Sequence, residues 1–520
     1  MERTGWFETS DPLISRLHEN IVWGLRGNFL YLPTDCPQRD ERLGWTGDIQ
    51  VFAPTAAFLY DVRGFLDSWL RDLAVEQRAG DGVVPFVVPN ALRIAKPAAA
   101  WGDAATVIPW VLVQRYADIA TLTRQYQSMK EWVDVLIRLA GERRLWEGMF
   151  QFGDWLDPDA PPERPAQAKT DADIVASAYL FFSADAVARA AERLRNAADA
   201  GHYARVAAEV REAFLAEYVT PSGRMMSDAQ TGYALAITFG IAPDAQRQVL
   251  GDRLAELTRE SGYRIGTGFV GTPIILDALT QTGHAETARR LITQTESPSW
   301  LYPVTMGATT VWERWDSMLP DGSINPGEMT SFNHYAFGAV GDWLHRVVAG
   351  LAPAAEGYAR IRIAPRPLAG MDSASAAHLT PYGRAAVSWT RSSGTVQIEA
   401  TVPSNTRAEV DLPDGTRLEV GSGSYTWQVA VLDSGPGSRA KPGAVSFTST
   451  LAEIVDDPEA YALVLQVLQQ HNPDRTAQMW PSIRWRSGAL LEDTVFLFDS
   501  PSAVTEITAG LAELSARRAS

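Results

Sequence analysis

One short segment gathers charged side chains around a tryptophan. Residues 35 to 48 read Asp-Cys-Pro-Gln-Arg-Asp-Glu-Arg-Leu-Gly-Trp-Thr-Gly-Asp and contain four carboxylates and two arginines. Carboxylates can bind hydroxyls and move protons, an indole can cover the apolar face of a ring, and a guanidinium can fix its orientation, so these residue types suit a sugar-processing site. A solvated, charge-paired loop at a helix end would have a similar composition, because ion-pair networks also combine charges of both signs.

A second segment places another carboxylate between tryptophans. Residues 308 to 316 read Ala-Thr-Thr-Val-Trp-Glu-Arg-Trp-Asp, and residues 322 to 335 read Gly-Ser-Ile-Asn-Pro-Gly-Glu-Met-Thr-Ser-Phe-Asn-His-Tyr. Together with the first segment, they supply the pair of carboxyl groups that cleavage of a glycosidic bond requires. A glycine-rich stretch, Ile265-Gly-Thr-Gly-Phe-Val-Gly-Thr-Pro273, lies between the two in sequence.

The three segments resemble, in the same order, the signature segments of bacterial α-L-rhamnosidases of glycoside hydrolase family seventy-eight. The resemblance extends from about Thr4 to about Trp427. It implies a six-hairpin α/α toroid and an inverting hydrolase of rhamnose-containing glycosides. Members of this family usually carry β-rich domains ahead of the toroid, whereas this sequence enters the toroid almost at its first residue. That fits a piece of a longer protein or a minimal member.

The resemblance assigns the two catalytic roles to Glu41 and Glu313. One carboxyl must protonate the leaving oxygen, and the other must activate water or attack the anomeric carbon; an inverting enzyme keeps the two about 6.5–9.5 Å apart. Glu41 lies where the family has its general acid, and repulsion from Asp35, Asp40 and Asp48 would help to keep it protonated. An ion pair with either arginine of the loop is the alternative. Glu313 lies where the family has its general base, which implies inversion of configuration.

The resemblance also implies a set of substrate-binding side chains. Charge-assisted hydrogen bonds would orient the sugar ring, and tryptophans would face rhamnose, which carries a methyl group in place of a 6-hydroxyl. Structural roles compete at each position, since most of the 17 tryptophans must pack in the core. The set comprises Asp35, Arg39, Trp45, Asp48, Trp101, Trp155 and His334.

Composition narrows the class of protein. A chain of 520 residues that is 46% hydrophobic can bury one or more large cores. Its net charge of −16 argues against nucleic acid or an anionic membrane as partner and favours a neutral glycan. Cys36 is the single cysteine, which excludes an intrachain disulfide, and we expect it to have a packing role. The N-terminus has no apolar h-region and no uninterrupted apolar run could span a bilayer, so a cytoplasmic protein is expected.

Two apparent motifs do not indicate a cofactor or a metal. Gly266 to Gly271 satisfies G-x-G-x-x-G, but no apolar strand precedes it, which favours a loop of the toroid. Residues 321 to 328 resemble a calcium loop only superficially, because the glycine is displaced and Phe332 occupies the twelfth position. The seven histidines lack H-E-x-x-H spacing. We therefore expect neither a metal nor a cofactor.

Apolar periodicity predicts helices through most of residues 1–350. A cap at Asp11 and Pro12 precedes an amphipathic helix from about Ile14 to Leu30, which would deliver the charged loop at its C-terminal end. Asp48 to Tyr60 forms the next helix and is apolar nearly all round. Further paired helices are expected at about 104–142, 171–217, 229–260, 271–297 and 330–350. The fold class is therefore mainly α, with a six-hairpin α/α toroid as the catalytic domain.

The pattern changes after residue 350. Alternation at Val396, Ile398, Ala400 and Val402 predicts an antiparallel β-sandwich over residues 351–432, with a turn at Asp414-Gly415. Residues 433–443 have the composition of a linker. Residues 444–520 are predicted to be a mainly helical extension, with helices at Leu451 to Gln470 and Pro501 to Arg518 flanking an apolar run from Val495 to Phe498. Its role is open: it could pair subunits into a homo-oligomer or cover part of the barrel.

The sequence thus predicts an inverting α-L-rhamnosidase. A related toroid hydrolase acting on another deoxysugar or an unsaturated uronide would use the same two carboxylates. A carbohydrate-binding protein without turnover is the second class, although the presence of both carboxylates argues against it. Subsites beyond the rhamnose are expected from variable loops such as Asp157 to Thr170.

Overall fold

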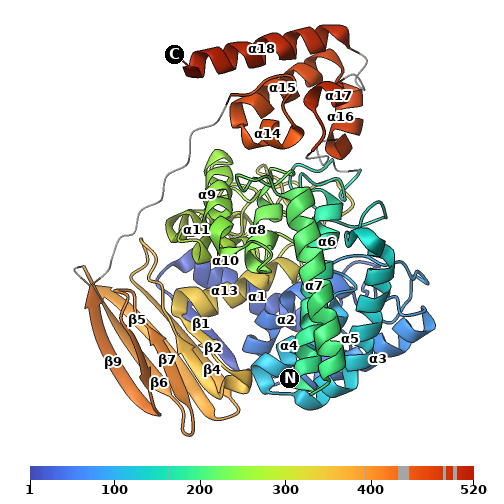
Figure 1. Ribbon diagram of the computed structural model, residues 1–520. Coiled ribbons are helices and arrows are strands. Elements are labelled where there is room, and N and C mark those ends of the chain that lie inside the picture. The colour runs from blue at the N-terminus through green and yellow to red at the C-terminus, as the bar shows by residue number, and fades with distance from the viewer. Residues whose placement is uncertain (162, 393, 431–443, 484–487, 496–499, 520) are drawn as a thin grey trace.

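The computed structural model describes residues 1–161, 163–392, 394–430, 444–483, 488–495 and 500–519 (Figure 1). The predicted linker, residues 433–443, lies outside the described residues, as do residues 496–498 of the predicted apolar run.

An α/α toroid occupies the first two thirds of the chain, as predicted. Inner helices such as α2 are buried around most of their circumference, whereas outer helices such as α5 bury one apolar face, so the sequence alternates between the two kinds of helix. The helices are α1 (Pro12–Asn28), α2 (Thr46–Leu59), α3 (Arg63–Ala79), α4 (Ala104–Tyr116), α5 (Ile119–Ala140), α6 (Ala172–Arg193), α7 (Ala197–Tyr218), α8 (Gln230–Thr238), α9 (Asp244–Glu260), α10 (Ile275–Gln281), α11 (Ala285–Ile292) and α12 (Leu301–Thr305). A run of short helical turns, η2 (Ala336–Ala339), α13 (Val340–Trp343) and η3 (Leu344–Ala349), closes the ring.

Several of the predicted site segments lie before the N-terminal ends of toroid helices. Residues 35–45 lead into α2, Trp101 precedes α4, Trp155 precedes α6, and residues 265–273 precede α10. Helix N-termini carry partial positive charge, which favours carboxylates near them. The toroid therefore gathers the site segments at one end, and this end suits an acidic site.

The helix α6 is long and apolar enough to cross a membrane by length and composition, although the sequence contains no uninterrupted apolar run of that size. Packing inside the toroid accounts for its apolarity, since 83% of its apolar window is buried.

Two β-sheets follow the toroid. The five-stranded sheet is antiparallel with the order β1-β4-β5-β6-β9, and the four-stranded sheet has the order β2-β3-β7-β8. In the second sheet β3 pairs with β7 in parallel, so this sheet is mixed rather than purely antiparallel. The predicted turn at Asp414-Gly415 joins β7 and β8, with Gly415 at φ 88°. The strands are β1 (Gly5–Thr9), β2 (Leu351–Pro353), β3 (Arg360–Ile363), β4 (Ser373–Thr380), β5 (Gly383–Ser392), β6 (Thr395–Val402), β7 (Arg407–Asp411), β8 (Arg417–Val420) and β9 (Gly423–Ala430).

The first strand of the chain belongs to the C-terminal sheet. β1 pairs with β4, placing Gly5 opposite His378 and Thr9 opposite Ala374. These residues were predicted to be part of the helical domain, because a five-residue strand shows no long alternation and its partner is far away in sequence. This pairing ties the toroid to the sheet.

The C-terminal extension forms a small helical unit. It comprises α14 (Leu451–Asp456), α15 (Pro458–His471), α16 (Pro473–Ile483), α17 (Leu491–Val495) and α18 (Pro501–Ala519). The single helix predicted from Leu451 to Gln470 is wrong: Asp457 caps α15 and Pro458 starts it, which divides the segment in two. The apolar core of this unit includes Met226 from the loop before α8. The unit therefore packs on the end of the toroid that carries the site segments (Figure 1).

Three buried histidines lie between the toroid and the five-stranded sheet. His18 on α1 and His345 on η3 approach to 2.9 Å between their Nε2 atoms, and Phe58 stacks against His345 and His378. Burial, with nearby arginines adding to it, lowers the pKa of His18 and of His378 to about 3, and places the pKa of His345 well below 6.5. All three are therefore neutral in the folded chain at neutral pH.

We expect acid to destabilise the fold through these histidines. Below about pH 6.5 the unfolded chain takes up protons that the buried rings cannot accept until near pH 3, so the free energy of unfolding falls through this window. His378→Asn, which can keep the hydrogen bond to the Phe58 carbonyl, should reduce the loss between pH 7 and pH 5 by about 2 kcal/mol. Urea unfolding at both pH values measures this loss. His202→Asn, at an exposed histidine of α7, serves as control, and equal losses in all three chains would contradict the assignment.

Candidate active site

The guanidinium of Arg39 lies between the two predicted catalytic carboxylates. Nη1 donates to Glu313 Oε2 at 2.7 Å, and Nη2 donates to Glu41 Oε2 and to Glu313 Oε1, the latter at 3.4 Å. Both carboxylates thus lie within hydrogen-bond reach of one nitrogen. The Glu41 side chain is 26% exposed and that of Glu313 is 7% exposed. Glu41 therefore has room to move away, whereas Glu313 is held in place.

The loop that carries Glu41 holds it from a second side. Trp45 Nε1 donates to Glu41 Oε1 at 2.6 Å, so Trp45 and Arg39 bind different oxygens of the same carboxylate. Asp40, which was expected to repel Glu41, is fully exposed and pairs with Arg42 at 3.7 Å. The expected repulsion between Asp40 and Glu41 is wrong, because the Asp40 side chain lies in solvent rather than in the site.

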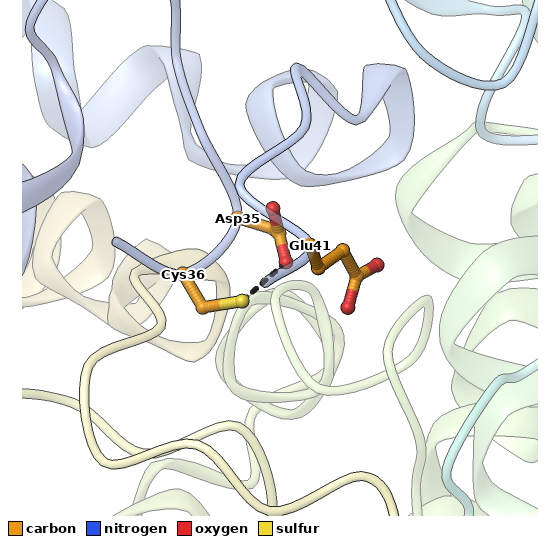
Figure 2. A group of neighbouring side chains, drawn as sticks. All are labelled: Asp35, Cys36 and Glu41. Carbon is orange, nitrogen blue, oxygen red and sulfur yellow. Dashed lines mark hydrogen bonds between the residues drawn. The ribbon is translucent and has the colours of Figure 1, made fainter. Parts of the chain in front are cut away.

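Asp35 closes the same loop from inside. It accepts a hydrogen bond from the Leu43 backbone N–H at 2.8 Å and another from the Cys36 thiol at 2.6 Å, which Figure 2 shows. Burial raises the pKa of Asp35, and burial together with Asp35 raises the pKa of the Cys36 thiol. Cys36 therefore remains a thiol and a hydrogen-bond donor, which fits a packing role.

Asp35, Cys36 and Glu41 bring ligand-type atoms within 4.8 Å of one another (Figure 2). A metal ion would need the thiolate form of Cys36, which burial opposes. The Arg39 guanidinium already contacts Glu41 and lies 4.0 Å from Asp35. This group is better explained as a thiol–carboxylate hydrogen bond beside a Glu41 that is paired with Arg39 than as a metal site.

Asp48 and His334 face each other behind this cluster. Asp48 lies in the first turn of α2, and His334 Nε2 lies 3.1 Å from its Oδ1. Burial, reinforced by the neighbouring carboxylates, raises the pKa of Asp48 well above its usual range, and burial lowers the pKa of His334 to about 4. Both groups are therefore driven toward their uncharged forms, which can donate and accept hydrogen bonds with sugar hydroxyls.

The three predicted tryptophans meet at Phe152, which the sequence analysis missed. Ring centroids lie 4.3 Å from Phe152 for Trp101, 5.4 Å for Trp155 and 6.0 Å for Trp45. Trp101 is buried at 3% exposure, whereas Trp45 and Trp155 are partly exposed. Trp101 therefore supports the aromatic wall from beneath, and Trp45 and Trp155 form its accessible part. The sequence signal that could have identified Phe152 is its spacing, because it follows another aromatic residue, Phe150, by two positions.

A buried carboxylate, Asp154, explains the glycine-rich loop. It accepts hydrogen bonds from the backbone N–H groups of Gly268, Val270 and Gly271 at 2.7, 3.0 and 2.9 Å, and from Thr231 Oγ1 at 2.5 Å. A Cβ at Gly268 would lie 2.2 Å from the Asp154 carbonyl oxygen, so no other residue fits there. The G-x-G-x-x-G pattern thus forms an anion-binding loop whose anion is a side chain of the same chain.

The toroid and its paired carboxylates define a six-hairpin glycosidase domain. A model of the bacterial alpha-L-rhamnosidase 6 hairpin glycosidase domain matches residues 2–348, and a model of the bacterial alpha-L-rhamnosidase C-terminal domain matches residues 350–426. The chain belongs to the bacterial α-L-rhamnosidase family.

Individual relatives agree with this placement. An alpha-L-rhamnosidase of Streptomyces avermitilis is 41% identical over 443 residues, covering 81% of this chain and 42% of the relative. One from Formosa agariphila is 38% identical over 425 residues, covering 81% and 46%. The chain spans less than half the length of these curated relatives.

Solved structures are similar over the same part of the chain. Native alpha-L-rhamnosidase from Aspergillus terreus matches with a TM-score of 0.81 and 46% identity, over 82% of this chain and 50% of that one. The Streptomyces avermitilis enzyme complexed with L-rhamnose matches with a TM-score of 0.77 and 41% identity, over 82% and 42%.

We expect Asp154 to be essential for folding of the site end. Asp154→Ala leaves three buried backbone N–H groups without their acceptor, which should lower the free energy of unfolding by about 3 kcal/mol or more. Urea unfolding measures the change. Asp159→Ala removes a carboxylate of the same loop whose side chain is 71% exposed, and should change stability by less than about 1 kcal/mol. Equal effects of the two substitutions would contradict the role assigned to Asp154.

Proposed function

We propose that the chain is the catalytic part of an inverting α-L-rhamnosidase that releases terminal L-rhamnose from rhamnose-containing glycosides. Glu41 acts as the general acid and Glu313 as the general base. Family membership supports the substrate, and the observation that carries the two roles is the position of Arg39, which contacts both carboxylates. Asp35, Asp48 and His334 would bind sugar hydroxyls, and Trp45 and Trp155 would face the ring.

The surroundings of Glu313 suit a base. Burial raises its pKa, but two hydrogen bonds from Arg39 act in the opposite direction and favour the carboxylate. A base must be ionised to take a proton from water, so the guanidinium offsets part of the cost of burial. Glu41, on a loop and partly exposed, can swing outward, which opens the gap that sugar and water need.

The charges of the site disfavour an unsaturated uronide as substrate. Asp35, Glu41 and Glu313 surround the Arg39 guanidinium, and burial keeps His334 neutral. An anionic substrate would meet several carboxylates and a cation that they already neutralise. A neutral deoxysugar avoids this repulsion.

The two roles predict different responses to the leaving group. With p-nitrophenyl α-L-rhamnoside the leaving phenolate needs little protonation, so Glu41→Gln should lose far less activity there than with an alkyl rhamnoside. Glu313→Gln should lose about 10²–10⁴-fold with both substrates, because activation of water is needed in each case. Initial rates measure the losses, and proton NMR of the first product should show β-L-rhamnose.

Two control variants separate the loss of a catalytic group from the loss of a negative charge near the site. Asp40→Asn removes the fully exposed carboxylate next to Glu41, and Asp321→Asn removes an exposed one in the segment after Glu313. Both should retain activity within about twofold, since surface charges contribute little. Release of α-L-rhamnose as first product would overturn inversion. Full activity of either glutamine variant would overturn its role.

A further inference from the structure

A cavity of about 210 Å³ lies beside the carboxylate pair. One wall comes from the loop after Trp155, including Leu156 and Ala160, and the other from residues 297–298, 314–316 and 328–329. The volume is below the roughly 300–1,000 Å³ of pockets for drug-sized ligands and suits a single sugar ring. None of the nine side chains assigned above to catalysis or rhamnose binding lines it.

The cavity is nevertheless adjacent to the site of bond cleavage. Arg314, in its wall, directly follows Glu313 in sequence. Glu328, also in the wall, has a backbone carbonyl 3.5 Å from Arg39 Nη1. A sugar in this cavity would therefore lie next to the residues that hold the two carboxylates.

The polar part of the wall is fixed in position. Arg314 donates to both oxygens of Asp316, from Nε at 2.6 Å and from Nη2 at 3.2 Å, and Asn325 donates to Asp316 Oδ2 at 2.9 Å. Arg314 Nη1 has no acceptor among the residues that the structure describes. A held arginine–aspartate pair offers a donor and acceptors at fixed places, as recognition of sugar hydroxyls requires.

The charge of the wall is negative. Asp157, Asp316 and Glu328 line the cavity against the single cation Arg314, among the described lining residues. Lys169 neutralises Asp157 at 2.5 Å from Oδ1, and Arg314 pairs with Asp316, so Glu328 supplies the remaining negative charge of the wall. The remaining surface is apolar, including Pro158, Pro161 and Trp315. A uronic acid would be repelled here, whereas a neutral ring has hydroxyl partners and apolar surface.

We propose that this cavity binds the sugar that carries the rhamnose, and that it selects a neutral hexose over a uronic acid. The proposal rests on the proposed rhamnosidase function. It makes the loop after Trp155 and the Arg314–Asp316 pair determinants of which glycoside is cleaved, separate from the residues that bind rhamnose.

Filling the cavity tests this proposal. Ala160→Phe, on the wall opposite Glu313, should lower kcat/KM for α-L-rhamnosyl-glucose disaccharides about tenfold through KM and leave p-nitrophenyl α-L-rhamnoside within twofold. Arg314→Gln should likewise lower kcat/KM for the disaccharides relative to kcat/KM for p-nitrophenyl α-L-rhamnoside. Ala198→Phe, at an exposed alanine of α7, is the matched control and should change neither substrate. For the wild type, kcat/KM for α-L-rhamnosyl-glucuronate should be at least tenfold lower than kcat/KM for the α-L-rhamnosyl-glucose disaccharide with the same linkage.

Equal losses of Ala160→Phe on both substrates, or no loss on any disaccharide, would overturn the proposal. So would equal cleavage of the glucuronate. Failure of the proposed function is a separate result: wild type would then not hydrolyse p-nitrophenyl α-L-rhamnoside at all. In that case saturation-transfer NMR with rhamnosyl-glucose still tests the cavity, because the glucose protons should lose their signal in Ala160→Phe and keep it in Ala198→Phe.

Discussion

The site depends on burying several carboxylates around one guanidinium. Asp35, Asp48 and Glu313 are each at most 6% exposed, and a buried charge is costly unless it is paired or neutralised. Arg39 supplies the pairing at Glu313, while the Cys36 thiol and a backbone N–H satisfy Asp35. Asp48 is driven toward its protonated form instead. Burial raises the pKa of all three carboxyls, so the site is built against the cost of desolvation and depends on the partners that offset it.

The toroid makes this arrangement possible by fixing the segments that carry it. Inner helices packed on all sides cannot shift, so the residues just before their first turns have defined positions. Asp154 adds a second constraint, because it anchors the loop before α10 through three backbone hydrogen bonds beside Trp155. Pairing of β1 with β4 joins the start of the chain to the sheet. Glu41 and Glu313 both lie in segments without regular structure, and Asp35 holds the loop that carries Glu41 closed through its hydrogen bond from the Leu43 backbone.

Local signals predicted much of this and failed where contacts are distant. The helices, the strand alternation and the charged segments follow from periodicity and composition within short windows. Three features join residues that are far apart in sequence, so no short stretch of sequence contains both partners. They are the pairing of strand β1 with β4, the packing of Met226 against the C-terminal helices, and the hydrogen bonds between Asp154 and the glycine-rich loop. The sequence placed Arg39 near Glu41, but only the fold brings Glu313 to the same guanidinium.

The Arg39 guanidinium, which both glutamates share, also suggests which glutamate takes which role in the proposed mechanism. The carboxylate that stays beside Arg39 keeps a hydrogen-bonded cation that offsets part of the cost of burying its charge, as a base requires. Burial fixes Glu313, and partial exposure on a loop frees Glu41, so Glu41 is the one that can leave. Movement of Glu41 away from Arg39 would thus widen the gap for sugar and water while Glu313 stays in place. One geometric asymmetry, a buried Glu313 and a partly exposed Glu41, would then set the separation that inversion needs.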